Sequence, residues 1–265
     1  MADFDINSVI DVDDPANNDR LFPADKGRGF DPSKVVKAMF APPSDIKVIP
    51  RNEWPARLEE QLANKTSCMD YGAEIAPLDQ AQSNYCWGHS STGGTMFVRA
   101  RMNLPYVPLS AYSVAATLMK GANEGGWCGL SAKFIRETGV CSQAIWPQGD
   151  FKYAKYQNNP DAQKSFAAHK ITLDFADLSK DVYDQNLSFD MVATCLLLGI
   201  PCAVDFNWWS HSVLAVRLVQ VEAGSYGIEI RNSWGKSWEN NGNGILRGSK
   251  AIPDGAIAFR QATFA

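Results

Sequence analysis

The feature that most constrains this chain is a cysteine, a histidine and an asparagine that stand far apart, in that order. Cys86 is followed by a tryptophan and lies six residues after Gln80. His211 opens an apolar stretch, and Asn232 begins the sequence Asn-Ser-Trp-Gly. A thiol, an imidazole and a carboxamide are the parts of a cysteine-nucleophile site. Only a fold that joins distant segments can assemble them.

Each of these residues has a simpler explanation when it is taken alone. A free cysteine such as Cys86 usually packs as a small buried hydrophobe, and His211 could be a core residue on an apolar strand. His89 is a competing base, because it stands three residues after Cys86 on the same helical face. Nothing near His89 in the sequence orients its ring, which favours a packing role. The occurrence of all the parts together favours a site.

Charge and apolar pattern argue against several classes of function. The net charge is −4, which gives no indication of a nucleic-acid partner or an anionic membrane. No apolar run has the length of a membrane span, and the N-terminus lacks the pattern of a signal peptide. The six cysteines form no zinc-spaced cluster, so neither a metal nor a cofactor is expected. Reduced thiols in a cytoplasmic or other reducing compartment are the simpler interpretation.

Residues 1–46 differ in amino-acid composition from residues 47–265, which are expected to form the globular domain. The first 25 residues contain seven Asp and one Arg, and prolines recur through the segment. A solvated tail is one interpretation. The other interpretation is a segment that covers a cleft or binds a partner protein. The apolar cluster 35–40 would then attach it.

Helices are expected in the middle of the chain and strands after Pro201, which indicates an α+β fold. Two adjacent glycines, Gly93 and Gly94, predict that the first helix packs closely against another element. A helical lobe is expected at roughly 85–198, and a β lobe at roughly 199–265 with part of 47–84. The expected helices are 86–102, 111–119, 129–138 and 188–198, and the expected strands are 202–206, 213–219, 226–230, 244–246 and 256–259.

The motifs together resemble the papain-like cysteine peptidases. The segment from Gln80 to Cys86-Trp87 is similar to the one that carries the family's nucleophile. The stretch 210–216 resembles its histidine strand, and 232–238 resembles its Asn-Ser-Trp-Gly-x-x-Trp motif. Gly125-Gly126 resembles the family's Gly-Gly loop. The resemblance covers roughly residues 48–250.

The chain also departs from the family pattern. Ser83 and Asn84 stand where a cysteine and a glycine are usual, which removes a common disulfide. The stretch between Asp205 and His211 is much shorter than usual, so part of the substrate-binding wall is either absent or rebuilt. Residues 1–47 are too few for the family's usual inhibitory prodomain.

The resemblance implies a two-lobed fold, with a helical lobe, an antiparallel β-barrel-like lobe and an active site in the cleft between them. It also implies the activity of a thiol protease. Cys86 would be the nucleophile, at a helix N-terminus whose dipole stabilises a thiolate. His211 would be its imidazolium partner, and Asn232 would orient the ring. Gln80 would donate to the oxyanion together with the Cys86 N–H. Trp234 would cover the His211–Asn232 hydrogen bond and border the substrate.

The resemblance also implies a peptide or protein substrate. Gly125 and Gly126 would pair with the backbone of an extended peptide, because a glycine allows close approach. Trp127 and Cys128 would line the pocket for the second residue before the cut. Asp205 would lie near the floor of that pocket and favour a basic side chain.

Two other classes of function fit the same residues. One is a papain-fold binding or structural component of a larger assembly, with little turnover. The other is an amidase or acyltransferase that uses the same thiol chemistry on a non-peptide substrate.

Overall fold

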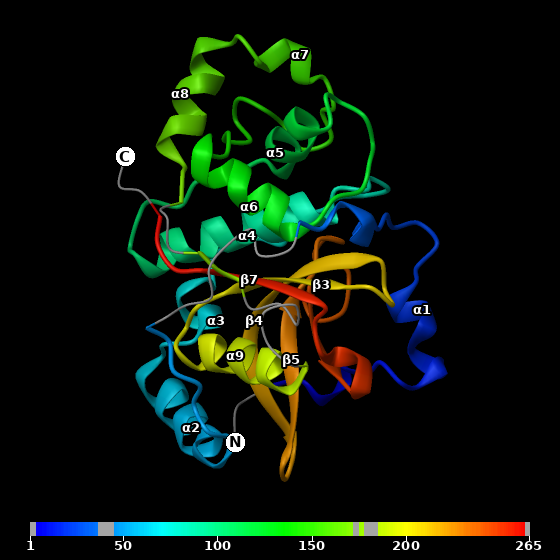
Figure 1. The fold of residues 1–265 in the computed structure, drawn as a ribbon, viewed down its shortest axis with the longest axis vertical. Helices are drawn as coiled ribbons and strands as arrows, with labels where there is room; N and C mark the ends of the chain where they lie inside the picture. The colour runs from blue at the N-terminus through cyan, green and yellow to red at the C-terminus, as the bar shows by residue number, and fades with distance from the viewer. Residues whose placement is uncertain (1–3, 37–44, 172–174, 178–184, 263–265) are drawn as a thin grey trace.

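The computed structural model describes residues 4–36, 45–171, 175–177 and 185–262. A group of helices lies on one side of the molecule and a twisted sheet with its own helices on the other (Figure 1). This confirms the α+β class that the order of helices and strands predicts. Within the described ranges, no helix has both the length and the hydropathy needed to cross a membrane.

The helical lobe is built around α4 (Cys86–Arg101), which lies between the other helices and the sheet (Figure 1). Every residue of α4 from Cys86 to Arg99 is buried, because the helix has neighbours on all sides. The helix begins at the residue that the sequence predicts. The other helices of this lobe are α5 (Ala111–Leu118), α6 (Cys128–Glu137), α7 (Tyr153–Tyr156) and α8 (Pro160–Ala168).

The described residues contain one sheet of seven strands in the order β1-β6-β5-β4-β3-β7-β2. Neighbouring strands are antiparallel except for β1 and β6, which run parallel. Each of the five strands expected from the sequence is present within a few residues. The strands are β1 (Val9–Asp11), β2 (Phe175–Asp177), β3 (Cys202–Phe206), β4 (His211–Glu222), β5 (Ser225–Arg231), β6 (Asn243–Arg247) and β7 (Gly255–Phe259).

The helix α9 (Gln185–Leu197) packs on the sheet and against α2 (Trp54–Asn64), not with the helical lobe to which residues 85–198 are assigned above. Its buried apolar residues, such as Val192 and Leu196, share a core with β3 and β4. A helix that is apolar over most of its surface needs two apolar neighbours, and the sheet and α2 supply them. It also begins before Ser188, which is therefore not its N-cap. The remaining short helices are α1 (Asn18–Leu21), α3 (Cys68–Tyr71) and the 3₁₀ turns Ile6–Ser8, Pro15–Asn17, Pro32–Lys34, Arg51–Glu53 and Ser249–Ala251.

Residues 4–36 are packed on the protein rather than solvated. Their acidic side chains cap short turns: Asp5, Asp14 and Asp31 each accept a backbone N–H at the start of a 3₁₀ turn. Ile10 and Leu21 are buried in the core of the sheet. The apolar cluster 35–40 is expected above to attach this segment, but residues 37–40 lie outside the described ranges and Val36 is exposed.

The adjacent glycines Gly93 and Gly94 of α4 give a test of how tightly the lobes meet. A Cβ at Gly94 would lie 2.7 Å from the Phe259 ring, whereas one at Gly93 would lie 3.3 Å from a Leu214 methyl carbon. We expect Gly94→Ala to lower the free energy of unfolding by about 1–2 kcal/mol, because overpacking outweighs the gain of about 1 kcal/mol in helix propensity. Gly93→Ala is the matched control and should cost less in urea unfolding. Equal stabilisation by both would contradict the close contact.

Candidate active site

The fold brings the predicted catalytic residues to one place where the helical and β lobes meet. Cys86 is the first residue of α4, His211 is the first residue of β4, and Asn232 follows the end of β5. Since β4 and β5 are antiparallel neighbours, the start of one and the end of the other lie side by side. The helix α4 packs directly against β4, which brings the elements that carry Cys86 and His211 into contact.

The imidazole of His211 is held on three sides. Its Nε2 lies 2.8 Å from Asn232 Oδ1, which also accepts the Ser233 N–H at 2.8 Å. Trp234 stacks on the ring at a centroid distance of 4.7 Å, and Trp209 meets it edge-on at 4.8 Å. Nδ1 has no hydrogen-bond partner among the described residues. The ring is thus oriented through its ε side, with the δ nitrogen available for proton transfer.

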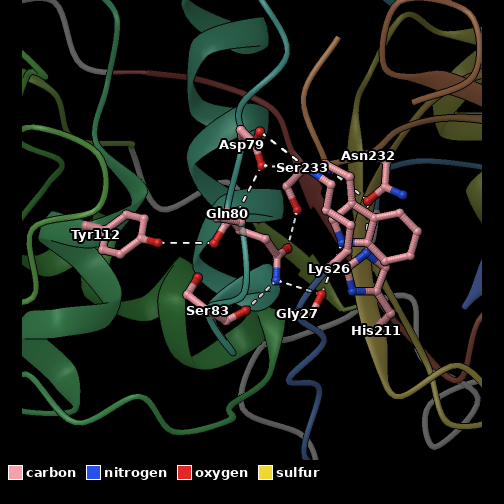
Figure 2. Close-up of polar contacts among 11 residues, drawn as sticks. Lys26, Gly27, Asp79, Gln80, Ser83, Tyr112, His211, Asn232 and Ser233 are labelled. Carbon is pink, nitrogen blue, oxygen red and sulfur yellow. Dashed lines mark hydrogen bonds and ion pairs between the residues drawn. The ribbon is translucent and has the colours of Figure 1, made fainter. Parts of the chain in front are cut away.

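The side-chain amide of Gln80 is held in one orientation by hydrogen bonds at both its oxygen and its nitrogen (Figure 2). Its Oε1 accepts the Ser233 hydroxyl, which leaves the amide N–H groups as donors. Nε2 donates to the Ser83 carbonyl at 2.7 Å and to the Gly27 carbonyl at 3.0 Å. Tyr112 donates its hydroxyl to the Gln80 carbonyl and braces the backbone.

An N-terminal segment crosses this site. We name residues 26–34 the strap. The Gly27 carbonyl accepts from Gln80 Nε2 and from Trp234 Nε1, each at 3.0 Å. The Gly29 N–H donates to Cys86 Sγ at 3.2 Å. A peptide carbonyl and a peptide N–H therefore already engage the glutamine and the thiol.

Two glycines let the strap lie this close to the protein. A Cβ at Gly27 would stand 2.1 Å from the Ser83 carbonyl oxygen, and one at Gly29 would stand 2.1 Å from that of Asn84. These contacts are with backbone atoms that cannot rotate away. Neither position therefore accepts a side chain while the strap is seated.

The strap continues along the Gly125-Gly126 loop. Gly126 donates its N–H to the Gly29 carbonyl at 2.9 Å and accepts the Asp31 N–H at 2.8 Å. A Cβ at Gly125 would lie 2.7 Å from the Gly29 carbonyl, so the missing side chain admits a neighbouring backbone. Gly126 lacks room for a side chain on another side, because a Cβ there would lie 2.6 Å from the Trp87 ring.

Charged and apolar side chains fasten both ends of the strap. Lys26 pairs with Asp79, and the Lys34 ammonium donates to the Gly125 carbonyl at 2.9 Å. Phe30 is buried in the same apolar cluster as Trp127 and Cys128. The predicted pocket wall is therefore next to a side chain of this chain's own N-terminal segment.

The electrostatics of the covered site favour neutral groups. Burial raises the pKa of the Cys86 thiol to about 11, although the N–H donors of Ser212 and Gly29 oppose the rise. Burial, with a smaller contribution from the Arg28 cation, lowers the pKa of His211 to about 3, although the hydrogen bond to Asn232 opposes the fall. At neutral pH the covered site therefore holds a thiol and a neutral imidazole.

Asp205 lies at the back of the site on β3 and is fully buried. One carboxylate oxygen accepts the Cys128 N–H at 3.2 Å and its thiol at 2.9 Å, and the other accepts the Ser212 hydroxyl. Burial raises the pKa of Asp205 to about 6, although these donors oppose the rise. Its charge also raises the pKa of Cys86.

The sequence reasoning missed two residues of the site, Trp209 in the short connection between β3 and β4 and Ser233 after the end of β5. Trp209 contacts His211, and its neighbour Trp208 stacks on it at 5.5 Å. Phe22 of the N-terminal segment meets Trp208 edge-on, so this segment packs against the short connection. The other missed residue, Ser233, lies within the Asn-Ser-Trp-Gly motif, where its position alone could have identified it.

His89 packs rather than competing as a base, since it is buried with Nδ1 bonded to the Tyr85 carbonyl at 2.8 Å. Burial lowers its pKa to about 4. Across the described ranges, no group of three or more His, Cys, Asp and Glu side chains is placed to hold a metal ion.

Comparison with known proteins identifies the fold. No protein-family model matches the chain. Ananain from Ananas comosus is 26% identical over 192 residues, which cover 65% of this chain and 52% of ananain. The chain therefore spans about half the length of this curated relative.

Solved structures match over a larger share of the chain. Xylellain, a cysteine protease from Xylella fastidiosa, superposes with a TM-score of 0.58 at 16% identity, covering 89% of this chain and 96% of xylellain. Digestive procathepsin L 3 of Tenebrio molitor gives 0.54 at 21% identity, covering 69% and 65%. Bromelain protease from Ananas comosus, in complex with the E64 inhibitor, gives 0.51 at 21% identity, covering 75% and 98%.

The protein has the papain-like cysteine peptidase fold, as the motifs in its sequence indicate. The two lobes and the meeting of α4 with β4 are the features of that fold on which the site depends.

The buried Asp205 predicts a pH dependence of stability. Its pKa in the folded protein is raised, so its contribution to stability is present at pH below about 4 and is lost as the pH rises through 6. Between pH 4 and 7 the loss is about 2 kcal/mol. In urea unfolding, Asp205→Asn should remove this part of the pH dependence. Asp161→Asn, at an exposed carboxylate, should keep it. Identical pH dependence in both variants would contradict the assignment.

Proposed function

We propose that this protein is a cysteine-type peptidase that hydrolyses peptide bonds through a thioester on Cys86. The observation that carries the proposal is the arrangement around the Gly27 carbonyl. A peptide oxygen there already accepts a hydrogen bond from the Gln80 amide, while the thiol and the His211–Asn232 pair stand beside it. A site that stabilises an oxyanion needs donors at this position.

In the proposed reaction, Cys86 first transfers its proton to His211, and the thiolate attacks the carbonyl carbon of the substrate. Gln80 and the Cys86 N–H stabilise the resulting oxyanion. The imidazolium gives its proton to the leaving amine as the C–N bond breaks, which leaves a thioester. Neutral His211 then takes a proton from water, whose oxygen attacks the thioester and releases the acid and the thiol. Asn232 keeps the ring oriented throughout.

We further propose that the seated strap blocks this reaction. The Gly27 carbonyl occupies the donor position of Gln80, and the thiol is engaged by the Gly29 N–H rather than aimed at a carbonyl carbon. Arg28 adds a positive charge that disfavours the imidazolium of His211. Removal of the strap would admit water and a substrate, and both changes favour the ion pair of thiolate and imidazolium.

For the substrate, we propose that Gly125 and Gly126 pair with the peptide backbone before the cut, as they pair with the strap. Trp127 and Cys128 would wall the pocket for the second residue. A preference there for a basic side chain stays a proposal. The Asp205 carboxylate lies directly behind Cys128, but its oxygens are already hydrogen-bonded to Cys128 and Ser212.

The strap can be opened without deleting any residue. The double variant Gly27→Ala/Gly29→Ala should unseat the strap, because both Cβ atoms would clash with backbone oxygens. We expect labelling of Cys86 by a peptidyl epoxide, mapped by mass spectrometry, to become at least tenfold faster, with hydrolysis of a small peptide substrate.

Adding His211→Ala to the opened variant is the control, and it should abolish the labelling. A folded, opened variant that does not label would reject the peptidase and favour a binding or structural component. Labelling with turnover only of non-peptide amides or esters, or with transfer to an added amine, would favour an amidase or acyltransferase.

The oxyanion role of Gln80 can be measured in the same opened background. Gln80→Ala should lower kcat by about 10²–10³, because one oxyanion donor is lost. The exposed neighbour offers the matched control Gln82→Ala, which should keep kcat. A Gln80 variant that still turns over at the parental rate would exclude the glutamine from the oxyanion site.

A further inference from the structure

The N-terminal segment consists of two parts with different attachments to the protein. We name residues 5–22 the anchor, to distinguish them from the strap at residues 26–34. The residues Ala24 and Asp25, which join the two parts, are both exposed. The boundary is therefore open to solvent, whereas the parts on either side of it are packed.

The anchor is built into the β lobe. Its strand β1 lies at the edge of the sheet, parallel to β6, with Ile10 paired to Leu246. Ile10 is 0% exposed and Leu21 is 1% exposed, and both belong to the core that contains β4 and α9. Removing the anchor would expose this core and the edge of β6.

The anchor also supplies acceptors to buried tryptophans that surround the catalytic imidazole. Trp209 donates its indole N–H to the Leu21 carbonyl, and Trp238 donates to the Arg20 carbonyl at 3.0 Å. Trp209 contacts the rings of both His211 and Trp234, and Trp238 packs edge-on against Trp234 at 5.7 Å. Without the anchor, both indoles would lose their acceptors, which is costly for buried donors.

An ion pair fastens the anchor near the same place. The Arg20 guanidinium pairs with the Glu239 carboxylate through two hydrogen bonds and also donates to the Val9 carbonyl at 3.1 Å. The strap, in contrast, has one buried side chain, Phe30, among half-exposed or exposed residues. The anchor contributes buried side chains to the core of the β lobe, whereas the strap mainly contacts residues of the cleft.

We propose that the anchor stays bound to the β lobe in the active enzyme and that only the strap leaves the cleft. In this role Leu21 is a positioning residue: its carbonyl holds Trp209, and Trp209 holds the ring of His211. The proposal rests on the proposed peptidase function for its catalytic consequence. The retention of the anchor is inferred only from its packing on the β lobe and does not depend on the peptidase function.

Retention can be tested by cutting the full chain at the boundary. A recognition sequence for a site-specific protease is inserted between the exposed residues Ala24 and Asp25, and the purified protein is cut. We expect the N-terminal fragment to remain bound in a 1:1 complex in native mass spectrometry and gel filtration. A fragment that separates under native conditions would overturn the proposal, whether or not Cys86 still labels.

The positioning role has a separate readout. In the Gly27→Ala/Gly29→Ala background, Trp209→Phe keeps an aromatic ring but removes the N–H that Leu21 accepts. We expect alkylation of Cys86 by iodoacetamide at pH 6–7 to slow at least threefold, with a shifted pH profile. Trp146→Phe is the matched control, since Trp146 donates to the Asp150 carbonyl in the helical lobe. Its profile should match the parent, and a Trp209 variant with the parental profile would overturn the positioning role.

The two readouts also separate the anchor from the peptidase proposal. Retention of the fragment is measured without any turnover. If Cys86 fails to label in every opened variant while the fragment stays bound, the peptidase proposal fails and the anchor stands. If labelling is normal and the fragment dissociates, the anchor fails and the peptidase proposal stands.

Discussion

The rest of the structure depends on how the ring of His211 is held. An imidazole can exchange protons with a thiol only if its tautomer and orientation are set, and here Asn232 and two tryptophans set them. These partners come from two parts of the chain, because Asn232 and Trp234 share one motif and Trp209 lies in another segment. The pairing of β4 with β5 supplies Asn232, the short β3–β4 turn supplies Trp209, and the N-terminal segment braces that tryptophan. The sheet and its connections therefore position this side chain as well as forming the core of the β lobe.

The sequence predicts the parts of this site well where the signal is local. Cys86-Trp87 and Asn-Ser-Trp-Gly are short motifs, and the strands β3 to β7 follow from apolar runs between turn residues. The anchor could not be predicted in this way. Its strand has only three residues, and its turns are capped by aspartates whose pattern in the sequence is typical of an acidic tail. What orders it is distant: indole donors of Trp209 and Trp238, which no local pattern reveals. The packing of α9 on the sheet also depends on distant contacts, so the sequence wrongly predicts that this helix belongs to the helical lobe.

In the proposed function, the strap would control protonation as well as access. Burial drives Cys86 and His211 toward their neutral forms, and the charges of Asp205 and Arg28 act in the same direction on the thiol and on the imidazole, respectively. A covered cysteine in this state is a poor nucleophile and a poor target for oxidation, since both reactions need the thiolate. The same contacts that exclude a substrate therefore also protect the thiol.

The strap is tethered at both ends, to the anchor on one side and to the globular domain on the other. A segment held in this way has an effective concentration at the cleft that is set by the chain and not by the amount of protein. Dilution cannot release it, and a free peptide must compete with it at that local concentration. One cut in the chain would leave the other tether in place. Removal of the strap from the protein therefore requires two breaks, whereas opening of the cleft requires only weaker strap contacts or a competitor that binds more tightly than the strap.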